Sequence, residues 1–170
     1  TELDDFTPTD QEIEEYYNSH QDEFIDPARA RLDVVRFELT ASAADAEDAR
    51  FTADRVRDQL AAGEDFAALA KTYSEAPTSQ VDGNTGFLQR GQREDVYFDT
   101  LDGLAPDEIS EPVEAADGYY VLKLIEKKDE EGETKYNVQE ILVKTTLSRQ
   151  TVDSLYTVAN ELRDRAAATG

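Results

Sequence analysis

The sequence contains no cysteine, no methionine and no tryptophan, and its only histidine is His20. Without cysteine the chain cannot form a disulfide, use a thiol nucleophile or build a thiolate metal site. The absence says little about the compartment, because cysteine-free chains occur on both sides of a membrane. One histidine without cysteine offers no set of metal ligands, so we expect neither a metal nor a cofactor and interpret His20 as an exposed helix residue.

Long apolar runs are also absent. No stretch of the 170 residues approaches the length of a membrane span, and the first residues, TELDDF, do not match a signal peptide. We therefore expect a segment of a longer precursor that does not itself insert into a membrane. With 39% hydrophobic residues, the chain is long enough to bury one core and begin a second.

Basic residues are scarce. The chain carries 39 Asp and Glu against 17 Lys and Arg, which gives a net charge of −22. Such a field repels nucleic acid and anionic lipid, so we expect neither as a partner. The acidic residues are spread along every segment, and two interpretations remain open: a surface adapted to high salt, as in a halophile, or an ordinary acidic domain.

Four short motifs carry the strongest signal. They read GEDFAALAKTYSE at residues 63–75, GNTGF at 83–87, DEISEPV at 107–113 and GYYVLK at 118–123. In this order and spacing they resemble the parvulin (PpiC-type) peptidyl-prolyl cis/trans isomerases. The resemblance implies an α+β fold, a four-stranded antiparallel sheet with covering helices. It also implies a periplasmic or extracytoplasmic folding factor that acts on unfolded or proline-containing polypeptide, and it leaves open membrane anchoring through a segment outside this chain.

Local patterns agree with this fold. Thr9 and Glu12 form a capping-box signature for a helix over residues 8–24, which resembles the connector before the rotamase domain of large parvulins. Residues 31–39 alternate between two faces and predict the first strand. The other elements follow from periodicity and turn residues: a helix through 49–60, a short helix capped by Asp65, a strand at 86–88, a helical turn at 96–104, an edge strand at 109–113 and a closing strand at 119–127.

The pattern begins again after a charged linker. Residues 136–144, YNVQEILVK, resemble the family's first-strand motif V-x-x-HILVK better than residues 31–39 do. An offset of 106 superposes Val34 on Glu140. We therefore predict a connector helix at residues 1–28, a parvulin-like domain at 29–128 and, at 129–170, a linker plus the first strand and helix of a second parvulin-like domain. The alternative is an unrelated C-terminal arm.

The resemblance also locates the family's active-site positions, where most residues differ here. In the family, an apolar slot for the proline ring is flanked by two histidines and a Cys or Asp. The histidine positions fall on Val34 and Tyr120, and the Cys or Asp position falls on Ala76. The slot leucine is Thr85 and the slot methionine is Arg93. The remaining candidate substrate-binding residues are Phe87, Leu88, Tyr97 and Phe98. In the second module the histidine position is Glu140.

Three hypotheses remain. Rotation about an X-Pro bond has a barrier of ~18–20 kcal/mol, which a slot can lower by binding the ring and desolvating the amide, without a covalent step. First, the site has lost its chemistry and the domain is a chaperone-type binding module, because Arg93 places a charge in an apolar slot. Second, Tyr120 and Thr85 supply hydroxyls for an atypical but working isomerase. Third, the domain only spaces neighbouring parts or forms a homodimer.

Overall fold

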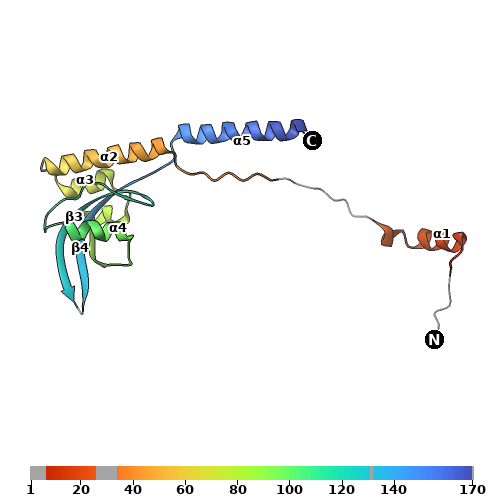
Figure 1. The fold of residues 1–170 in the computed structure, drawn as a ribbon, viewed down its shortest axis with the longest axis horizontal. Coiled ribbons are helices and arrows are strands. Elements are labelled where there is room, and N and C mark those ends of the chain that lie inside the picture. Colours follow the sequence, from red (N-terminus) through yellow and green to blue (C-terminus); the bar gives the residue numbers. More distant parts are fainter. Residues whose placement is uncertain (1–6, 26–33, 131, 170) are drawn as a thin grey trace. The chain divides into compact units, whose positions relative to one another are not determined.

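The computed structural model describes residues 7–25, 34–130 and 132–169 of the chain. Contacts divide the chain into two units, residues 1–36 and 37–170, and each is described by itself. In the described part, none of the helices is both long and apolar enough to cross a bilayer. In order, the elements are α1 (Asp10–Ser19), η1 (Gln21–Phe24), α2 (Ala43–Ala61), α3 (Phe66–Tyr73), η2 (Pro77–Val81), β1 (Asn84–Gln89), α4 (Asp95–Gly103), β2 (Val113–Ala115), β3 (Gly118–Glu130), β4 (Glu133–Lys144) and α5 (Arg149–Thr169) (Figure 1).

The first unit contains the predicted N-terminal helix. The Thr9 hydroxyl accepts a hydrogen bond from the backbone N–H of Glu12, whose carboxylate accepts one from the backbone N–H of Thr9, so the predicted capping box is confirmed. The α-helix ends at Ser19, and a 3-10 turn follows where the pattern predicted continuous helix. His20 is the C-cap residue, and its ring stacks on Tyr16 with centroids 4.1 Å apart.

The second unit is built on a four-stranded antiparallel sheet with the order β1-β4-β3-β2. Its longest pairing joins β3 to β4, with Tyr120 opposite Leu142 and Leu122 opposite Glu140. Because side chains alternate along a strand, this central pair contributes to both faces of the sheet. The predicted α+β architecture with covering helices is confirmed.

Each face of the sheet is covered by its own helices. One apolar cluster joins α2 and α3 to residues of β3 and β4, and the other joins α4 to the opposite face of the same two strands. The first cluster consists of Ala49, Ala53, Val56, Leu60, Phe66, Leu69, Ala70, Tyr119, Val121, Ile141 and Val143. The second consists of Ala76, Tyr97, Phe98, Leu101, Val113, Tyr120, Leu122, Leu124, Tyr136, Val138 and Leu142.

The predicted first strand is wrong. Residues 34–39 form no strand, Val34 is 83% exposed, and residues 31–33 lie outside the described part of the chain. The position beside β3 is occupied by β4, which the sequence assigned to a second module. The reason is burial on both faces: β4 places Ile141 and Val143 in one core and Val138 and Leu142 in the other. The division into domains at 28 and 128 stays a prediction.

Helices α2 and α5 begin at a shared carboxylate. Asp45 accepts hydrogen bonds from the backbone N–H groups of Ser42 and Ser148 and from the hydroxyl of Thr151. These bonds, led by that from Ser148, hold the pKa of Asp45 well below its usual value. A negative charge is favourable at a helix N-terminus, and here it serves two helices at once. From this point α5 extends away from the sheet, beyond the start of α2 (Figure 1).

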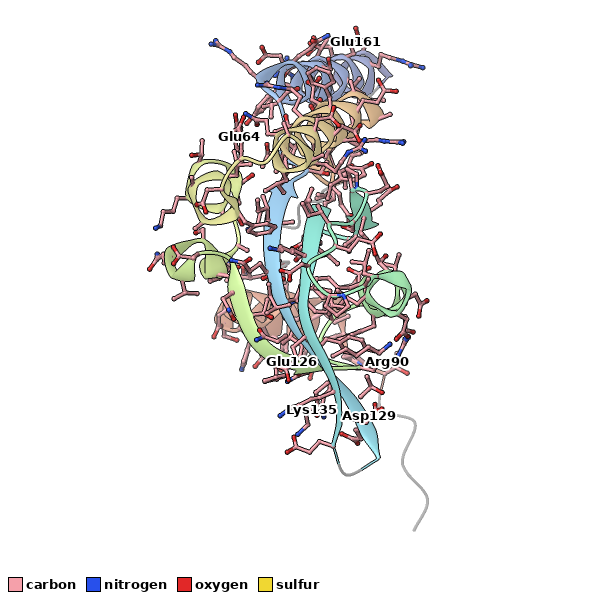
Figure 2. All side chains as sticks on the ribbon, turned by 90° about the vertical axis from the view of Figure 1, so that its left-hand side faces the viewer. Glu64, Arg90, Glu126, Asp129, Lys135 and Glu161 are labelled. Carbon is pink, nitrogen blue, oxygen red and sulfur yellow. The ribbon has the colours of Figure 1, made fainter. Side chains whose placement is uncertain are left out.

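The β3–β4 hairpin projects past the rest of the sheet. Figure 2 shows Asp129 and Lys135 near its tip, below Arg90. At its base, Asp102 accepts hydrogen bonds from Lys127 at 2.6 Å, from the hydroxyl of Tyr136 at 2.7 Å and from Arg90 at 2.7 Å. These three donors, Lys127 first, lower the pKa of Asp102 and attach α4 to the hairpin.

Candidate functional site

A buried carboxylate lies at the centre of the sheet. Glu140 of β4 is 1% exposed, on the face covered by α4. The Tyr97 hydroxyl donates a hydrogen bond to its Oε2 at 2.9 Å, and the Thr78 hydroxyl donates one to its Oε1 at 3.0 Å. Arg93 places Nη2 3.6 Å from Oε1. A buried charge is tolerated only when it is paired and hydrogen-bonded, and Glu140 has both kinds of partner.

Two tyrosines enclose this carboxylate. The rings of Tyr97 and Tyr120 meet edge to face with centroids 5.5 Å apart, and the Tyr120 hydroxyl donates to Asp117 at 3.2 Å. Burial raises the pKa of Tyr97, and the negative charge of Glu140 raises it further. Burial also raises the pKa of Tyr120, together with the charges of Asp117 and Glu140. Both phenols therefore keep their protons at neutral pH and act as hydrogen-bond donors, not as bases.

The structure brings together five of the predicted site residues. Ala76, Tyr97, Phe98 and Tyr120 belong to one apolar cluster, and Arg93 reaches Glu140 at its border. The exposed fractions are 5% for Ala76, 1% for Tyr97, 0% for Phe98 and 8% for Tyr120. Four of the residues predicted to surround the proline ring are therefore buried side chains of the core on this face of the sheet.

The other predicted residues lie elsewhere. Val34 is exposed and belongs to no strand, so the expected pairing of Val34 with Tyr120 on neighbouring strands is wrong. The Thr85 hydroxyl lies 3.1 Å from the carbonyl oxygen of Val138, to which it can donate. Phe87 is 41% exposed and lies under the ammonium of Lys128, 4.2 Å from the ring centroid. Leu88 packs at the edge of the α4 cluster.

Sequence reasoning missed three groups of the site. The sequence pattern indicates Glu140 only as the histidine position of a second module, although the better motif match at residues 136–144 is the signal that could place it in this sheet. Thr78, in η2, had no signal, because its partner Glu140 lies 62 residues away in the sequence. Asp117, in the turn before β3, accepts from Tyr120 only three residues away, but no motif marked it as part of the site.

The polar groups around Glu140 are suited to hydrogen bonding. It offers two phenols and a threonine hydroxyl as donors, and Glu140 accepts from two of them. Among the residues that the structure describes, no group of three or more His, Cys, Asp or Glu side chains is placed to hold a metal ion. The polar groups bind one another, so a substrate amide would have to compete with hydrogen bonds already made.

These features define an α+β domain whose polar centre lies between the two middle strands of an antiparallel sheet. The sequence pattern of the PPIC-type PPIASE domain matches residues 8–136. Because this match covers most of the chain, the protein belongs to the PPIC-type, or parvulin, peptidyl-prolyl isomerase domain family, and the resemblance seen in the sequence is confirmed.

Several curated proteins are similar to this chain. The foldase protein PrsA of Halalkalibacterium halodurans is 31% identical, over 80% of this chain and 37% of its own length. The chaperone SurA of Thiobacillus denitrificans is 32% identical over 62% of this chain and 25% of its own, and the periplasmic chaperone PpiD of Haemophilus ducreyi is 24% identical over 93% and 24%. The chain thus spans well under half the length of these relatives.

Among solved structures, the peptidylprolyl isomerase PrsA from Bacillus cereus aligns with a TM-score of 0.46 and 36% identity. That alignment covers 48% of this chain and 32% of the PrsA chain.

Proposed function

We propose that this domain binds extended polypeptide and accelerates X-Pro isomerisation little or not at all. One observation carries the proposal: Tyr97 and Tyr120, two of the residues predicted to surround the proline ring, are buried and pack edge to face beside the buried carboxylate of Glu140. A proline ring needs an apolar cavity, whereas here it would meet a carboxylate and the guanidinium of Arg93.

The cost of opening the slot supports this proposal. Displacing Tyr97 removes one of the two hydroxyl donors to Glu140 and leaves the carboxylate less well satisfied in a dry environment. Leaving a buried charged group without its partner costs at least ~1–3 kcal/mol, and this cost is added to the energy of binding any substrate. Catalysis requires that the twisted amide bind better than the planar one, so a term that opposes entry lowers the rate.

Peptide binding has other apolar surface available. Phe87 and Val96 are each 41% exposed. A hollow of about 490 Å³ lies between α4 and the segment that leads into β2, and its apolar lining includes Val96, Leu104 and Ile109. An extended peptide can use such surface without entering the filled slot.

The relatives support the same class of function. Their names describe a foldase and chaperones, and one of them is periplasmic. We therefore propose unfolded or proline-containing polypeptide as the partner and an extracytoplasmic location. A working isomerase that uses Tyr120 and Thr85, and a purely structural or dimerising module, are the alternatives that the experiment below separates.

The test measures isomerisation and binding in the same samples. NMR exchange on Xaa-Pro peptides should give a rate close to the uncatalysed one, whose time constant is tens to hundreds of seconds. Titration with an unfolded, proline-containing polypeptide should still shift the signals of Phe87 and Val96. A rate typical of active parvulins would overturn the binding-module assignment, and an absence of any binding would favour the structural role.

A gain-of-function variant sharpens the test. Because β4 occupies the place predicted for the first strand, we propose that Glu140, and not Val34, stands where the family carries its histidine. We expect Glu140→His with Tyr120→His and Arg93→Met to raise the isomerisation rate above that of the wild type. The matched control, Val34→His with the same two changes, should give no gain that depends on the histidine at residue 34, because Val34 is exposed.

A further inference from the structure

We infer that residues 34–39 and β4 are alternative occupants of a single position in the sheet, the one between β1 and β3. In the structure this position is held by β4, while residues 34–39 form no strand. The inference concerns which segment completes the sheet, so it does not depend on the proposed binding function.

The sequence contains an internal repeat, and the helix caps of the structure follow the same repeat. The offset of 106 residues aligns Val34 with Glu140 and Arg57-Asp58 with Arg163-Asp164. The same offset separates two helix N-caps, because Ser42 accepts from the N–H of Asp45 and Ser148 accepts from the N–H of Thr151, both at 3.2 Å. Residues 34–39 therefore stand in the same relation to α2 as β4 does to α5.

The unpaired segment at residues 34–39 has the apolar pattern of a strand. Val35 is 70% exposed, Phe37 36% and Leu39 60%, and the three alternate as in a strand. In the aligned register, Val35 and Phe37 take the places of Ile141 and Val143, which belong to the core under α2 and α3. The segment thus offers an apolar residue at each of these two core positions, which it does not use at present.

The other face explains why β4 holds the position. The aligned register puts Arg36 in place of Leu142, which is 3% exposed, and burying a guanidinium there is costly. It also puts Val34 in place of Glu140, so Tyr97 and Thr78 lose the acceptor of their hydrogen bonds. Both effects favour β4, and both arise from single residues that can be changed.

Exchange would alter the functional site as well as the sheet. With β4 in place, the centre of the site is a carboxylate bound to Tyr97. With residues 34–39 in place, the same point would carry the apolar side chain of Val34, and Tyr97 would lose its partner. One domain could therefore present either a filled polar site or an apolar one, depending on the strand that it uses.

The test exchanges the residues that decide the competition. In the 170-residue chain, Arg36→Leu and Leu142→Arg are combined, and amide hydrogen exchange is followed residue by residue. In the wild type we expect protection at residues 138–144 and none at 34–39. In the exchanged variant we expect protection to be gained at 34–39 and lost at 138–144. Adding Val35→Glu to this variant should abolish the gained protection and serves as the matched control.

A second measurement needs no charge in the core. Because the chain has no cysteine, any disulfide comes from introduced residues. Val121→Cys with Ile141→Cys should close rapidly on mild oxidation, since Val121 and Ile141 are paired. Val121→Cys with Val35→Cys should close more slowly, as the minor arrangement is trapped, and it should then show protection at 34–39.

Two outcomes would overturn the inference. One is an exchanged variant that keeps its protection at 138–144 or loses protection throughout the sheet without gaining it at 34–39. The other is a Val35→Cys/Val121→Cys variant that stays reduced under conditions in which the Val121→Cys/Ile141→Cys variant closes completely.

Discussion

Tyr97→Phe tests whether the centre of the domain is held by hydrogen bonds to Glu140. The substitution removes only the hydroxyl that donates to Oε2 at 2.9 Å and keeps the ring in its 1% exposed position, so it opens no large cavity. A hydrogen bond to a charged group contributes ~1.5–3 kcal/mol. We therefore expect the free energy of unfolding to fall by about that amount.

The assay is equilibrium unfolding in urea at pH 7 and constant salt, followed by circular dichroism. With a slope of ~2 kcal/mol per M, the midpoint should fall by about 1 M while the slope stays unchanged. The matched control is Tyr120→Phe, whose hydroxyl meets Asp117 at 3.2 Å in a partly buried place and should contribute only ~0.5–1.5 kcal/mol.

A double-mutant cycle with Glu140→Gln then isolates the pair. If the hydroxyl of Tyr97 stabilises the domain through the carboxylate, the two changes should couple by at least ~0.5 kcal/mol. A loss below ~0.5 kcal/mol for Tyr97→Phe, or additive single changes, would refute the idea that this carboxylate holds the site closed.

Three further predictions concern the stability of the domain. First, the net charge of −22 repels itself at low ionic strength, so the thermal midpoint should rise between 0.1 and 1 M NaCl, where the Debye length falls from ~10 to ~3 Å; a flat or falling midpoint would contradict this. Second, the pKa of the Asp102 carboxylate is lower in the folded state, so the ionised group stabilises the fold above its unfolded pKa of ~3.9, and this stabilisation is lost as the pH falls towards the folded pKa. Asp102→Asn should therefore lower the thermal midpoint at pH 7. The difference in thermal midpoint between this variant and the wild type should shrink below pH 4. Third, Gly118 has φ +149°, and a Cβ there would overlap the carbonyl oxygen of Val143. Gly118→Ala should therefore lower the free energy of unfolding in urea by more than ~2 kcal/mol, whereas Gly63→Ala, at φ +93° with open space around it, should lower it by only ~1–2 kcal/mol. Equal losses of unfolding free energy would show that the overlap at Gly118 is relieved.

Local signals predicted most of the secondary structure. The capping box at Thr9, the cap at Asp65 and the closing strand with its GYYVLK motif all appear where the residues indicated. These features depend on neighbours a few residues away, so periodicity and turn chemistry are sufficient to find them.

The prediction of a strand at residues 34–39 is wrong for a different reason. Their alternation is typical of a strand buried on one face, but the position beside β3 is buried on both faces and has a second candidate, β4, over a hundred residues away. Choosing between them requires comparing Arg36 with Leu142 at one core position, which a local pattern cannot do. The site shows the same contrast between local and distant information. Motif spacing indicated Tyr97, Tyr120 and Arg93, but it did not indicate Glu140, which contacts both Tyr97 and Arg93 from a distant strand.

The place of β4 in the sheet also governs the order in which the domain can form during synthesis. β4 lies between β1 and β3, although it comes after both of them in the chain and is therefore synthesised later. Until β4 has been made, β1 lacks its partner in the sheet, and β3 has only the three-residue β2 and a bridge from Lys123 to Ile109. Most of their backbone groups therefore stay open to other chains. Residues 34–39 are made long before, and on the exchange inferred above they are the segment able to cover β3 during that interval. The nascent domain would then carry its own temporary protection against aggregation and release it when β4 arrives.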